Sequence, residues 1–434
     1  MTSKLSHPDS AVRTLVLDDD PTGTQSATGV RVLFSWDEDR LRDAFTEHSS
    51  VYLLTNTRSI DEDAAVALVR QIRENAEAAA ASLGVSIRFV LRGDSTLRGH
   101  VFAESDQFMG PESVMVFVPA FPEGGRRTIN NVHYVKIDGV DTAAHETEFA
   151  RDPVFSFHGA TLAEYVKEKS SRTPVTASLD AVRSAEFASL LRSAPPGAVI
   201  LPDVDDDGDI TLMAAAIRDG GDHRDIVVRC GAPLAAELAG VVSTAPFTPE
   251  NQPPRSTLLV CGSHTDAAGR QLSAVEDRWG PALVLDTAAA LTDPIAAGKD
   301  LAARATRKLT DTPIVVIASE RHRRPEHNTL QHGRRVMEAL TTCVADIVEH
   351  VDLVISKGGI TSADVARVGI GANSAWVRGQ IRPGVSVWKL TDRSDRSLDY
   401  VVVPGNVGST DTLVDIIDAY GVAARGTTTE PVTP

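Results

Sequence analysis

Cysteine is scarce in this sequence, with three cysteines among 434 residues. Cys230, Cys261 and Cys343 lie far apart and show no Cys-x-x-Cys spacing. The pattern therefore predicts neither a disulfide framework nor a structural zinc site. We expect all three side chains to be small buried groups.

Long apolar runs are also missing. No stretch of about eighteen apolar residues occurs, and residues 1–10 lack the apolar core of a signal peptide. These absences favour a cytoplasmic protein without a membrane partner. Basic residues are outnumbered, since 43 Lys and Arg face 59 Asp and Glu, for a formal net charge of −16. Nucleic acids need a basic footprint, so we expect small-molecule partners instead.

Overall composition predicts a globular protein of two domains. Hydrophobic residues form 42% of the chain and charged residues 24%, as in folded proteins. A chain of 434 residues is too long for one ordinary core. The proline-rich polar stretch Ala245–Arg255 can continue neither a helix nor a central strand. We therefore expect domains over residues 1–247 and 248–434, with a disordered tail over 425–434.

Short β-branched or leucine-rich runs recur, each followed by a polar or glycine-rich loop and then a longer helical pattern. This alternation predicts an α/β fold in which each domain has a mainly parallel sheet flanked by helices. Ligands of such sheets bind outside the carboxyl ends of the strands, so we expect the active site there, in the interdomain cleft. The predicted strands are 14–17, 51–54, 87–91, 114–118, 199–201, 226–228, 258–260, 282–285, 314–317, 353–355 and 400–403.

The loops after the strands of the first half are rich in carboxylates, arginines and hydroxyls. Arginine can grip a carboxylate through two hydrogen bonds, while aspartate accepts from sugar hydroxyls or deprotonates one of them. Their concentration directly after strands favours a site for a polyhydroxy acid over isolated surface ion pairs. The candidate residues are Asp19, Asp20, Arg58, Arg92, Gly93, Asp94, Ser95, Glu123 and Arg126.

Glycine-rich and hydroxyl-rich loops follow strands of the second half, at Cys261–Thr265, Ser356–Ser362 and Pro404–Thr410. Glycine lets the backbone approach a phosphate, and a helix that follows presents free N–H groups. Each loop alone is typical of an ordinary turn, but together they favour a nucleotide site. Neither GxxxxGK[ST] nor a GxGxxG after a strand occurs, so the site differs from the common nucleotide fingerprints.

A phosphatase is the competing interpretation. The stretch Leu15–Thr22 fits the apolar strand and Asp-x-Asp-x-Thr pattern of haloacid-dehalogenase-like phosphatases, which would make Asp18 the nucleophile and Asp20 the acid/base. The later lysine and paired-acid motif have no convincing match, and the second domain would have no role. A non-catalytic ligand-binding protein that keeps both sites is a third hypothesis.

In their order along the chain, these loops resemble those of the four-carbon acid sugar kinases, which phosphorylate threonate, erythronate or oxo-tetronate. The resemblance covers nearly the whole chain and implies an N-terminal acid-sugar-binding domain and a C-terminal nucleotide-binding domain that uses ATP and Mg²⁺. The stretches that carry it are Asp18–Gln25, Asn56–Ser59, Arg92–His100, Pro122–Arg126, Lys357–Ser362, Gly379–Val385 and Pro404–Gly408.

The resemblance also implies roles for individual residues. Substrate contacts would come from Asp20, Arg58 and the Arg92–Ser95 loop. The candidate nucleotide contacts are Ser263, Lys357, Gly358, Gly359, Ile360, Thr361, Gly405, Asn406 and Gly408.

This chain departs from the family pattern in its glycine loops. Many members carry an aspartate where Ile360 stands, so no catalytic base can lie there. We then expect the base to be Asp20 or Asp94, with Asp20 the better candidate. A lysine of the family's last loop is also absent, and we expect Lys357 to replace its charge.

We therefore expect an ATP-dependent kinase that phosphorylates a hydroxyl of a four-carbon acid sugar, with the sugar carboxylate held by Arg58 and Arg92. The sequence leaves open the stereoisomer, the hydroxyl used and any metal bound by the protein itself. It also leaves open the oligomeric state, and a homo-oligomer is compatible with it.

Overall fold

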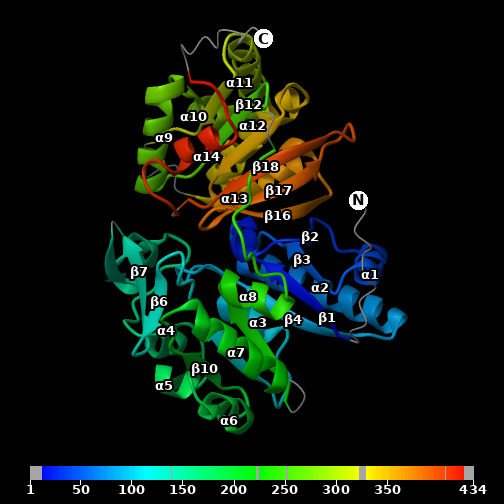
Figure 1. The fold of residues 1–434 in the computed structure, drawn as a ribbon, viewed down its shortest axis with the longest axis vertical. Helices are drawn as coiled ribbons and strands as arrows, with labels where there is room; N and C mark the ends of the chain where they lie inside the picture. The colour runs from blue at the N-terminus through cyan, green and yellow to red at the C-terminus, as the bar shows by residue number, and fades with distance from the viewer. Residues whose placement is uncertain are drawn as a thin grey trace, which may run out of the picture. The chain divides into compact units, whose positions relative to one another are not determined.

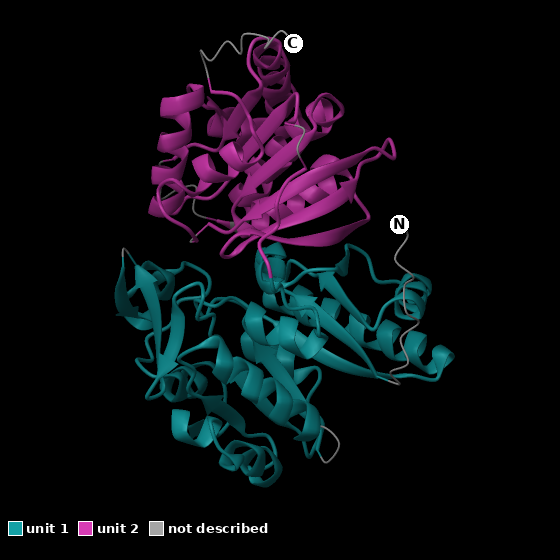
Figure 2. Cartoon of the chain, viewed as in Figure 1, with its two compact units in different colours: residues 1–244 teal, residues 245–434 magenta. Residues whose placement is uncertain are grey.

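The computed structural model describes residues 12–137, 139–220, 224–250, 253–321, 329–405 and 407–424. The chain divides into two compact units, Met1–Thr244 and Ala245–Pro434 (Figure 2). Each unit combines a sheet with flanking helices, which confirms the predicted α/β class (Figure 1). The tail expected to be disordered, 425–434, lies outside the described residues.

The main sheet of the first unit is parallel throughout, and all six strands predicted for this half belong to it. Two short strands of this sheet, Val30–Leu33 and Pro174–Ala177, were not predicted, because the first alternates with an arginine and the second begins with proline, which an edge strand tolerates. In spatial order the strands are β2 (Val30–Leu33), β3 (Ser50–Leu54), β1 (Val12–Asp18), β4 (Ser86–Arg92), β11 (Ile226–Cys230), β5 (Val114–Val118), β10 (Val199–Pro202) and β9 (Pro174–Ala177).

Helix α2 (Glu62–Leu83) shows how the sequence codes the helices of this unit. The Asp61 side chain accepts a hydrogen bond from the N–H of Ala64, and Gly84 ends the helix with a φ of 68°. Its apolar face is buried, with Ala65, Val69 and Ile72 among the buried residues. The other helices are α1 (Glu38–Glu47), α3 (Val101–Asp106), α4 (Leu162–Lys169), α5 (Leu179–Val182), α6 (Ala185–Ser193), α7 (Asp207–Gly220) and α8 (Ala232–Ala239).

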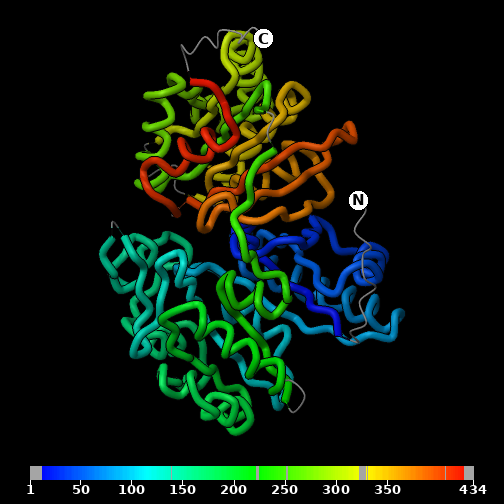
Figure 3. The backbone as a smooth tube through the Cα atoms, in the orientation of Figure 1, coloured from blue at the N-terminus to red at the C-terminus, as the bar shows by residue number. Residues whose placement is uncertain are grey.

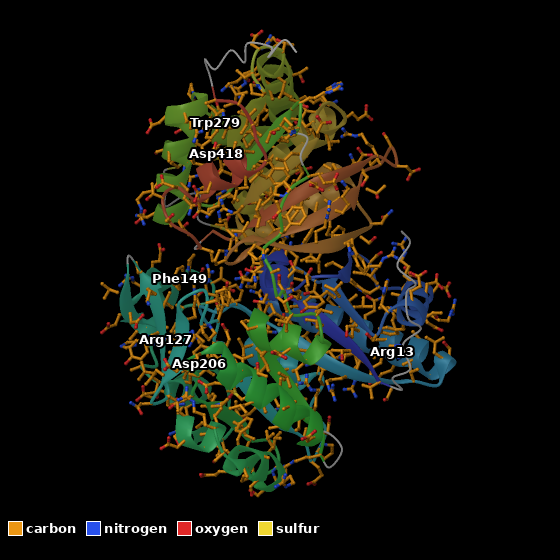
Figure 4. The ribbon with its side chains drawn as sticks, viewed as in Figure 1. Arg13, Arg127, Phe149, Asp206, Trp279 and Asp418 are labelled. Atoms are coloured by element: carbon orange, nitrogen blue, oxygen red, sulfur yellow. The ribbon has the colours of Figure 1, made fainter. Side chains whose placement is uncertain are left out.

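A small antiparallel sheet, β6 (Arg126–Ile129), β7 (Val132–Ile137) and β8 (Val140–Ala143), was not predicted. Asn130 and Asn131 form its first turn with φ angles of 52° and 63°, which asparagine tolerates better than most residues. Arg127, labelled in Figure 4, donates to Asp205 over 2.7 Å and pairs with Asp141. The consecutive asparagines were the available sequence signal for this hairpin.

The second unit has a mixed sheet. Neighbouring strands pair in parallel from β13 through β14, β12 and β15 to β18. Strands β17 and β16 then continue the sheet beside β18 with antiparallel pairs (orange in Figure 3). Neither was predicted, and the family stretch Gly379–Val385 covers the end of β16, the two-residue turn and the first residue of β17. In spatial order the strands are β13 (Leu283–Val284), β14 (Ile314–Ala318), β12 (Thr257–Cys261), β15 (Leu353–Lys357), β18 (Ser397–Val403), β17 (Val385–Thr391) and β16 (Ser374–Arg382).

The helices of the second unit are α9 (Asp266–Trp279), α10 (Thr287–Thr292), α11 (Pro294–Leu309), α12 (Leu330–Ile347), α13 (Gly359–Asp364) and α14 (Thr412–Ala419). A π-helical turn, Val365–Ile370, continues α13. In the part of the chain that the structure describes, no helix combines the length and apolar character needed to cross a membrane.

Helices α11 and α12 approach each other closely at Gly298, where an added Cβ would lie 2.5 Å from the carbonyl oxygen of Ala339. We expect Gly298→Ala to lower the free energy of unfolding by about 1–3 kcal/mol, because two backbones must separate. Gly333→Ala is the matched control, since a Cβ there meets no atom within 4 Å of the described structure. That change should raise stability by up to about 1 kcal/mol through helix propensity. Urea unfolding of both variants tests the pair, and equal midpoints would contradict the close approach.

Candidate substrate and nucleotide sites

Four neighbouring strands of the first unit, β3, β1, β4 and β11, end at one edge of the sheet. The register aligns Asp18 with both Leu54 and Arg92, and Arg92 with Cys230. The polar loops that follow these strands are therefore brought together. They form a cluster of charged side chains, which we call the Arg–Asp cluster: Asp18, Asp19, Asp20, Arg58, Arg92, Asp94, Arg98, Glu104 and Arg229.

Arg92 lies at the centre of the Arg–Asp cluster with a side chain 1% exposed. Its Nη1 is 3.1 Å from Asp18 Oδ1, 3.5 Å from Asp19 Oδ1 and 3.0 Å from Asp20 Oδ1. The three aspartates are also close enough together to ligate a metal ion. The guanidinium group, however, already occupies the place of the cation, so these residues do not fit a resident Mg²⁺.

Arg58 and Arg98 surround Asp94 on its Oδ2 side. Arg98 Nε donates to Oδ2 over 2.7 Å, Thr96 also donates to it, and Arg58 Nη1 lies 3.4 Å away. Burial alone would raise the pKa of Asp94, but the charges of Arg98 and Arg58 and these hydrogen bonds outweigh it. The pKa of Asp94 therefore lies well below its usual range.

The two candidate bases, Asp20 and Asp94, differ in which oxygens are engaged. Asp20 Oδ1 accepts from the N–H of Thr22 over 2.7 Å and from Arg92, while Oδ2 pairs with Arg58. The hydrogen bonds from Thr96 and Arg98 and the ion pair with Arg58 all reach Asp94 at Oδ2, and none of them uses Oδ1. The contacts of Asp20 thus use both of its carboxylate oxygens, whereas those of Asp94 use one.

Arg229 is a member of the Arg–Asp cluster that the sequence interpretation missed. Its side chain is 1% exposed, pairs with Glu104, and lies 3.3 Å from Asp19 Oδ2. Gly93 packs against it, because an added Cβ would lie 2.6 Å from Arg229 Nε. Gly93 thus makes room for a buried guanidinium. A lone arginine within the apolar strand Ile226–Cys230 was the available signal.

Ser95, Glu123 and Arg126, three further predicted site residues, lie in different environments. His133 Nε2 donates to the carbonyl of buried Ser95 over 2.9 Å, and burial lowers the pKa of His133 to about 4, so this histidine is neutral. Arg126 is buried in β6, and burial lowers its pKa to about 10. Glu123 is exposed in the turn before β6. His133 therefore positions the Ser95 loop, and Glu123 lies on the surface.

Asp18 is enclosed in a way that disfavours a phosphatase nucleophile. Its side chain is 1% exposed and packs against Gly23, where an added Cβ would lie 2.2 Å from either carboxylate oxygen. Burial raises the pKa of Asp18 to about 7, against the opposing charge of Arg92. A nucleophile must be ionised and open to the phosphate it attacks, and Asp18 is closed off.

The raised pKa of Asp18 predicts a pH dependence of stability. The ordinary value is 3.8 and the folded value about 7, so the folded chain keeps a proton that the unfolded chain releases. This contribution is fully present below the lower value and is lost as the pH rises through the higher one. Relative to Asp18→Asn, the wild type should lose up to about 1.4 kcal/mol of unfolding free energy per pH unit within that window. Urea unfolding from about pH 4 to 8 measures this, and parallel curves would refute it.

In the second unit, the adjacent parallel strands β12, β15 and β18 bring the three glycine-rich loops together. Thr265 Oγ1 donates to the carbonyl of Gly405 over 2.7 Å. An added Cβ at Gly405 would lie 2.7 Å from Ser263 Oγ, and one at Gly262 would lie 2.2 Å from Thr361 Oγ1. Ser263, Thr361 and Gly405 therefore lie side by side with their backbones close, as a site for phosphates requires.

The middle loop is shorter than predicted. Residues 356–362 were expected to form it, but β15 ends at Lys357 and α13 begins at Gly359, so Gly359, Ile360 and Thr361 form the first turn of the helix. Only Gly358 lies between them, with a φ of 117° that favours glycine. Ile360 is 39% exposed at this turn.

Lys357 is fully buried beneath the last glycine-rich loop. Its Nζ donates to the carbonyl oxygens of Pro404 over 2.6 Å and Val407 over 3.4 Å, and burial lowers its pKa to about 7. It supports the loop from inside. Gly408 lies in the same loop with a φ of 92°, and the predicted contact Asn406 lies outside the described residues.

Comparisons with known proteins match the two halves of the chain to two different domain families. A sugar-binding N-terminal domain matches residues 14–238, and a nucleotide-binding C-terminal domain matches residues 258–413. The chain is 30% identical over 248 residues to the D-erythronate kinase of Heliobacterium modesticaldum, a match that covers 53% of this chain and 52% of that one. It is 31% identical over 262 residues to the D-threonate kinase of Bordetella bronchiseptica, covering 57% of each chain. The chain thus spans little more than half the length of these two relatives.

A longer match, at 25% identity over 414 residues, joins the chain to the 3-oxo-tetronate kinase of Methylobacterium radiotolerans and covers 90% of this chain and 94% of that one. Among solved structures, a Haemophilus influenzae protein of the DUF1537 family has a TM-score of 0.59 at 18% identity, over 94% of this chain and 99% of that one. A Salmonella typhimurium LT2 protein has a TM-score of 0.67 at 15% identity, over 93% and 98%. At these identities the two structures share the fold alone. From its domain matches and relatives together, the chain belongs to the family of four-carbon acid sugar kinases.

Proposed function

We propose that this protein transfers the γ-phosphoryl group of ATP to a hydroxyl of a four-carbon acid sugar. The observation that carries the proposal is the Arg–Asp cluster, in which one carboxylate oxygen, Asp94 Oδ1, stays available beside several arginines. A sugar acid needs both kinds of group, because it offers hydroxyl donors and a carboxylate acceptor. Kinase names among the relatives support the same reaction.

Asp94 is the residue that we assign to the acceptor hydroxyl. Oδ1 would accept the hydroxyl hydrogen, the hydroxyl oxygen would attack the γ-phosphorus, and the bond to the ADP oxygen would break as the proton passes to Asp94. Its lowered pKa keeps Asp94 ionised and able to accept that hydrogen bond. Phosphoryl transfer has a loose transition state and depends more on positioning than on a strong base. When bound, Mg²⁺ would neutralise charge on the ATP phosphates, which would carry it to the site.

The arginines of the cluster would then divide the remaining tasks. Arg92 pairs with three aspartates and its side chain is 1% exposed, so we assign it the task of orienting those aspartates and not that of binding the substrate carboxylate. The Arg58 side chain also contacts three aspartates, Asp19, Asp20 and Asp94, but it is 10% exposed. We assign the substrate carboxylate to Arg58, with Arg92 as its positioning partner, whereas the sequence assigned both arginines to that contact.

A substrate panel tests the proposed reaction. Purified protein is incubated with ATP, Mg²⁺ and the stereoisomers of threonate, erythronate and 3-oxo-tetronate, while ADP release is followed. We expect release with at least one four-carbon acid and none with the matching neutral tetritol. Hydrolysis of p-nitrophenyl phosphate without ADP release would favour a phosphatase, and ligand binding without either product would favour a non-catalytic protein.

Asp94→Asn tests the assignment of the acceptor. The variant keeps the shape of the side chain but loses the ionised acceptor, so kcat should fall by about 10²- to 10⁴-fold. The affinity for ATP, measured by calorimetry, should stay within about twofold of the wild-type value. Asp205→Asn is the control, because it breaks an aspartate–arginine pair with Arg127 in the same unit, outside the cluster. Wild-type turnover by Asp94→Asn would exclude this role.

A further inference from the structure

The loop that carries Asp94, residues 93–99, contains a residue with a strained backbone. Leu97 has a φ of 69°, which lies in the left-handed region that bulky side chains rarely adopt. A backbone of this kind costs free energy, so it persists only where its surroundings hold it in place, and it is found often at functional sites. The Leu97 side chain is 3% exposed and packs in an apolar core cluster. The contacts that hold Leu97 therefore also hold the loop of Asp94.

Tyr165, on helix α4, holds the backbone of Leu97. Its hydroxyl donates to the carbonyl of Leu97 over 2.9 Å. The ring is buried and packs against three phenylalanines, with centroid distances of 6.0 Å to Phe102, 6.0 Å to Phe117 and 5.4 Å to Phe157. Burial raises the pKa of Tyr165 above its usual range, so the hydroxyl keeps the hydrogen that it donates. A ring enclosed in this way holds its hydroxyl in one place.

His133, in strand β7, holds the same loop two residues earlier. Its Nε2 donates to the carbonyl of Ser95 over 2.9 Å. Because a carbonyl can only accept, the hydrogen of the neutral ring lies on Nε2, and Nδ1 is left as an acceptor. The hydroxyl of Thr128 lies 3.0 Å from Nδ1 and supplies the matching donor. Thr128 therefore fixes both the tautomer and the orientation of His133.

The turn between β6 and β7 connects the two donors to one support. The N–H of Asn131, in this turn, donates to Asp203 Oδ1 over 2.8 Å. The side-chain oxygen of Asn131 accepts from the N–H of Ala163 over 2.9 Å, at the start of α4. His133 follows the turn by two residues, and Tyr165 lies in the first turn of α4 (Figure 1). The small antiparallel sheet and α4 thus reach the Asp94 loop together.

We propose that His133 and Tyr165 are positioning residues, which hold the loop so that Asp94 presents Oδ1 to the acceptor hydroxyl. The proposal rests on the proposed kinase function and gives the small antiparallel sheet and α4 a part in it. The two hydrogen bonds act on the backbone directly after Asp94, at the next residue and two residues beyond that. Phosphoryl transfer depends on positioning, so a loop that shifts should slow the reaction without weakening nucleotide binding.

Tyr165→Phe tests the proposal, because the variant loses the hydrogen bond to Leu97 and keeps the packing of the ring. We expect kcat to fall at least about tenfold, since a misplacement of about 1 Å can cost about 10²-fold. The Kd for ATP, measured by calorimetry, should stay within about twofold of the wild-type value. Thr147→Val is the matched control. It also removes a buried hydroxyl that donates to a backbone carbonyl, that of Ala144 over 2.7 Å, but outside the Asp94 loop.

Two variants of His133 separate positioning from packing. His133→Leu removes the donor to Ser95, whereas His133→Gln offers a side-chain N–H at a similar reach. We expect kcat to fall with leucine and to return to within about threefold of the wild-type value with glutamine, because the donor is restored. An equal fall in both would overturn the role of His133. Thermal unfolding shows whether each variant folds, and Tyr165→Phe with His133→Gln decides the matter if His133→Leu does not.

Hydrogen exchange of the segment Asp94–Gly99, followed by mass spectrometry, tests the loop without any turnover. The N–H of Leu97 donates to the carbonyl of Asp94 over 3.2 Å, so it should exchange slowly while the loop keeps its conformation. We expect faster exchange here in Tyr165→Phe and wild-type exchange in Thr147→Val. Unchanged exchange in Tyr165→Phe, or a wild-type kcat despite faster exchange, would overturn the proposal. A wild type that phosphorylates no acid sugar would instead refute the kinase function, and exchange alone would then decide whether the two residues hold the loop.

Discussion

The charge of Arg92 is buried at the end of β4, and the geometry of the first unit around it follows from the need to balance that charge. An unpaired buried guanidinium costs several kcal/mol, so three consecutive carboxylates from the end of β1 turn towards it. Arg229, in β11, is a second buried guanidinium, and its charge is balanced by Asp19 and Glu104. These pairs connect loops that are distant in sequence and hold them in one place.

Such a cluster is preorganised before any ligand arrives. Most carboxylate oxygens of the cluster already accept hydrogen bonds or pair with arginines. The hydrogen bonds to Asp94 from Thr96 and Arg98 use Oδ2, and we propose that Oδ1 accepts a hydrogen bond from a ligand. The same pairing limits the arginines, since the Arg92 side chain is 1% exposed and pairs with three aspartates. A side chain held by neighbours in this way positions a ligand more accurately than a mobile surface group. In the second unit, the loops are instead held close together by the absence of side chains at Gly262 and Gly405, where an added Cβ would meet Thr361 or Ser263.

The prediction of the fold succeeded where the local pattern was strong. The buried apolar runs that became β1, β4 and β12 were recognisable because parallel strands are buried on both faces. The strands β2, β9, β16 and β17 were missed. Two are short, with four residues each, and the other two mix polar residues with apolar ones, so pairing with a neighbour decided their conformation more than their own composition did.

The sequence by itself determined the α/β class, the polar loops after the strands and the kinds of side chain available there, because periodicity and composition are local properties. Tertiary structure alone decided how those side chains share their hydrogen bonds. It buried Lys357 beneath a loop, added Arg229 to the Arg–Asp cluster and engaged both oxygens of Asp20 while leaving one of Asp94 available. Each outcome depends on a partner far away in the chain, and such distances are fixed only when the strands pair.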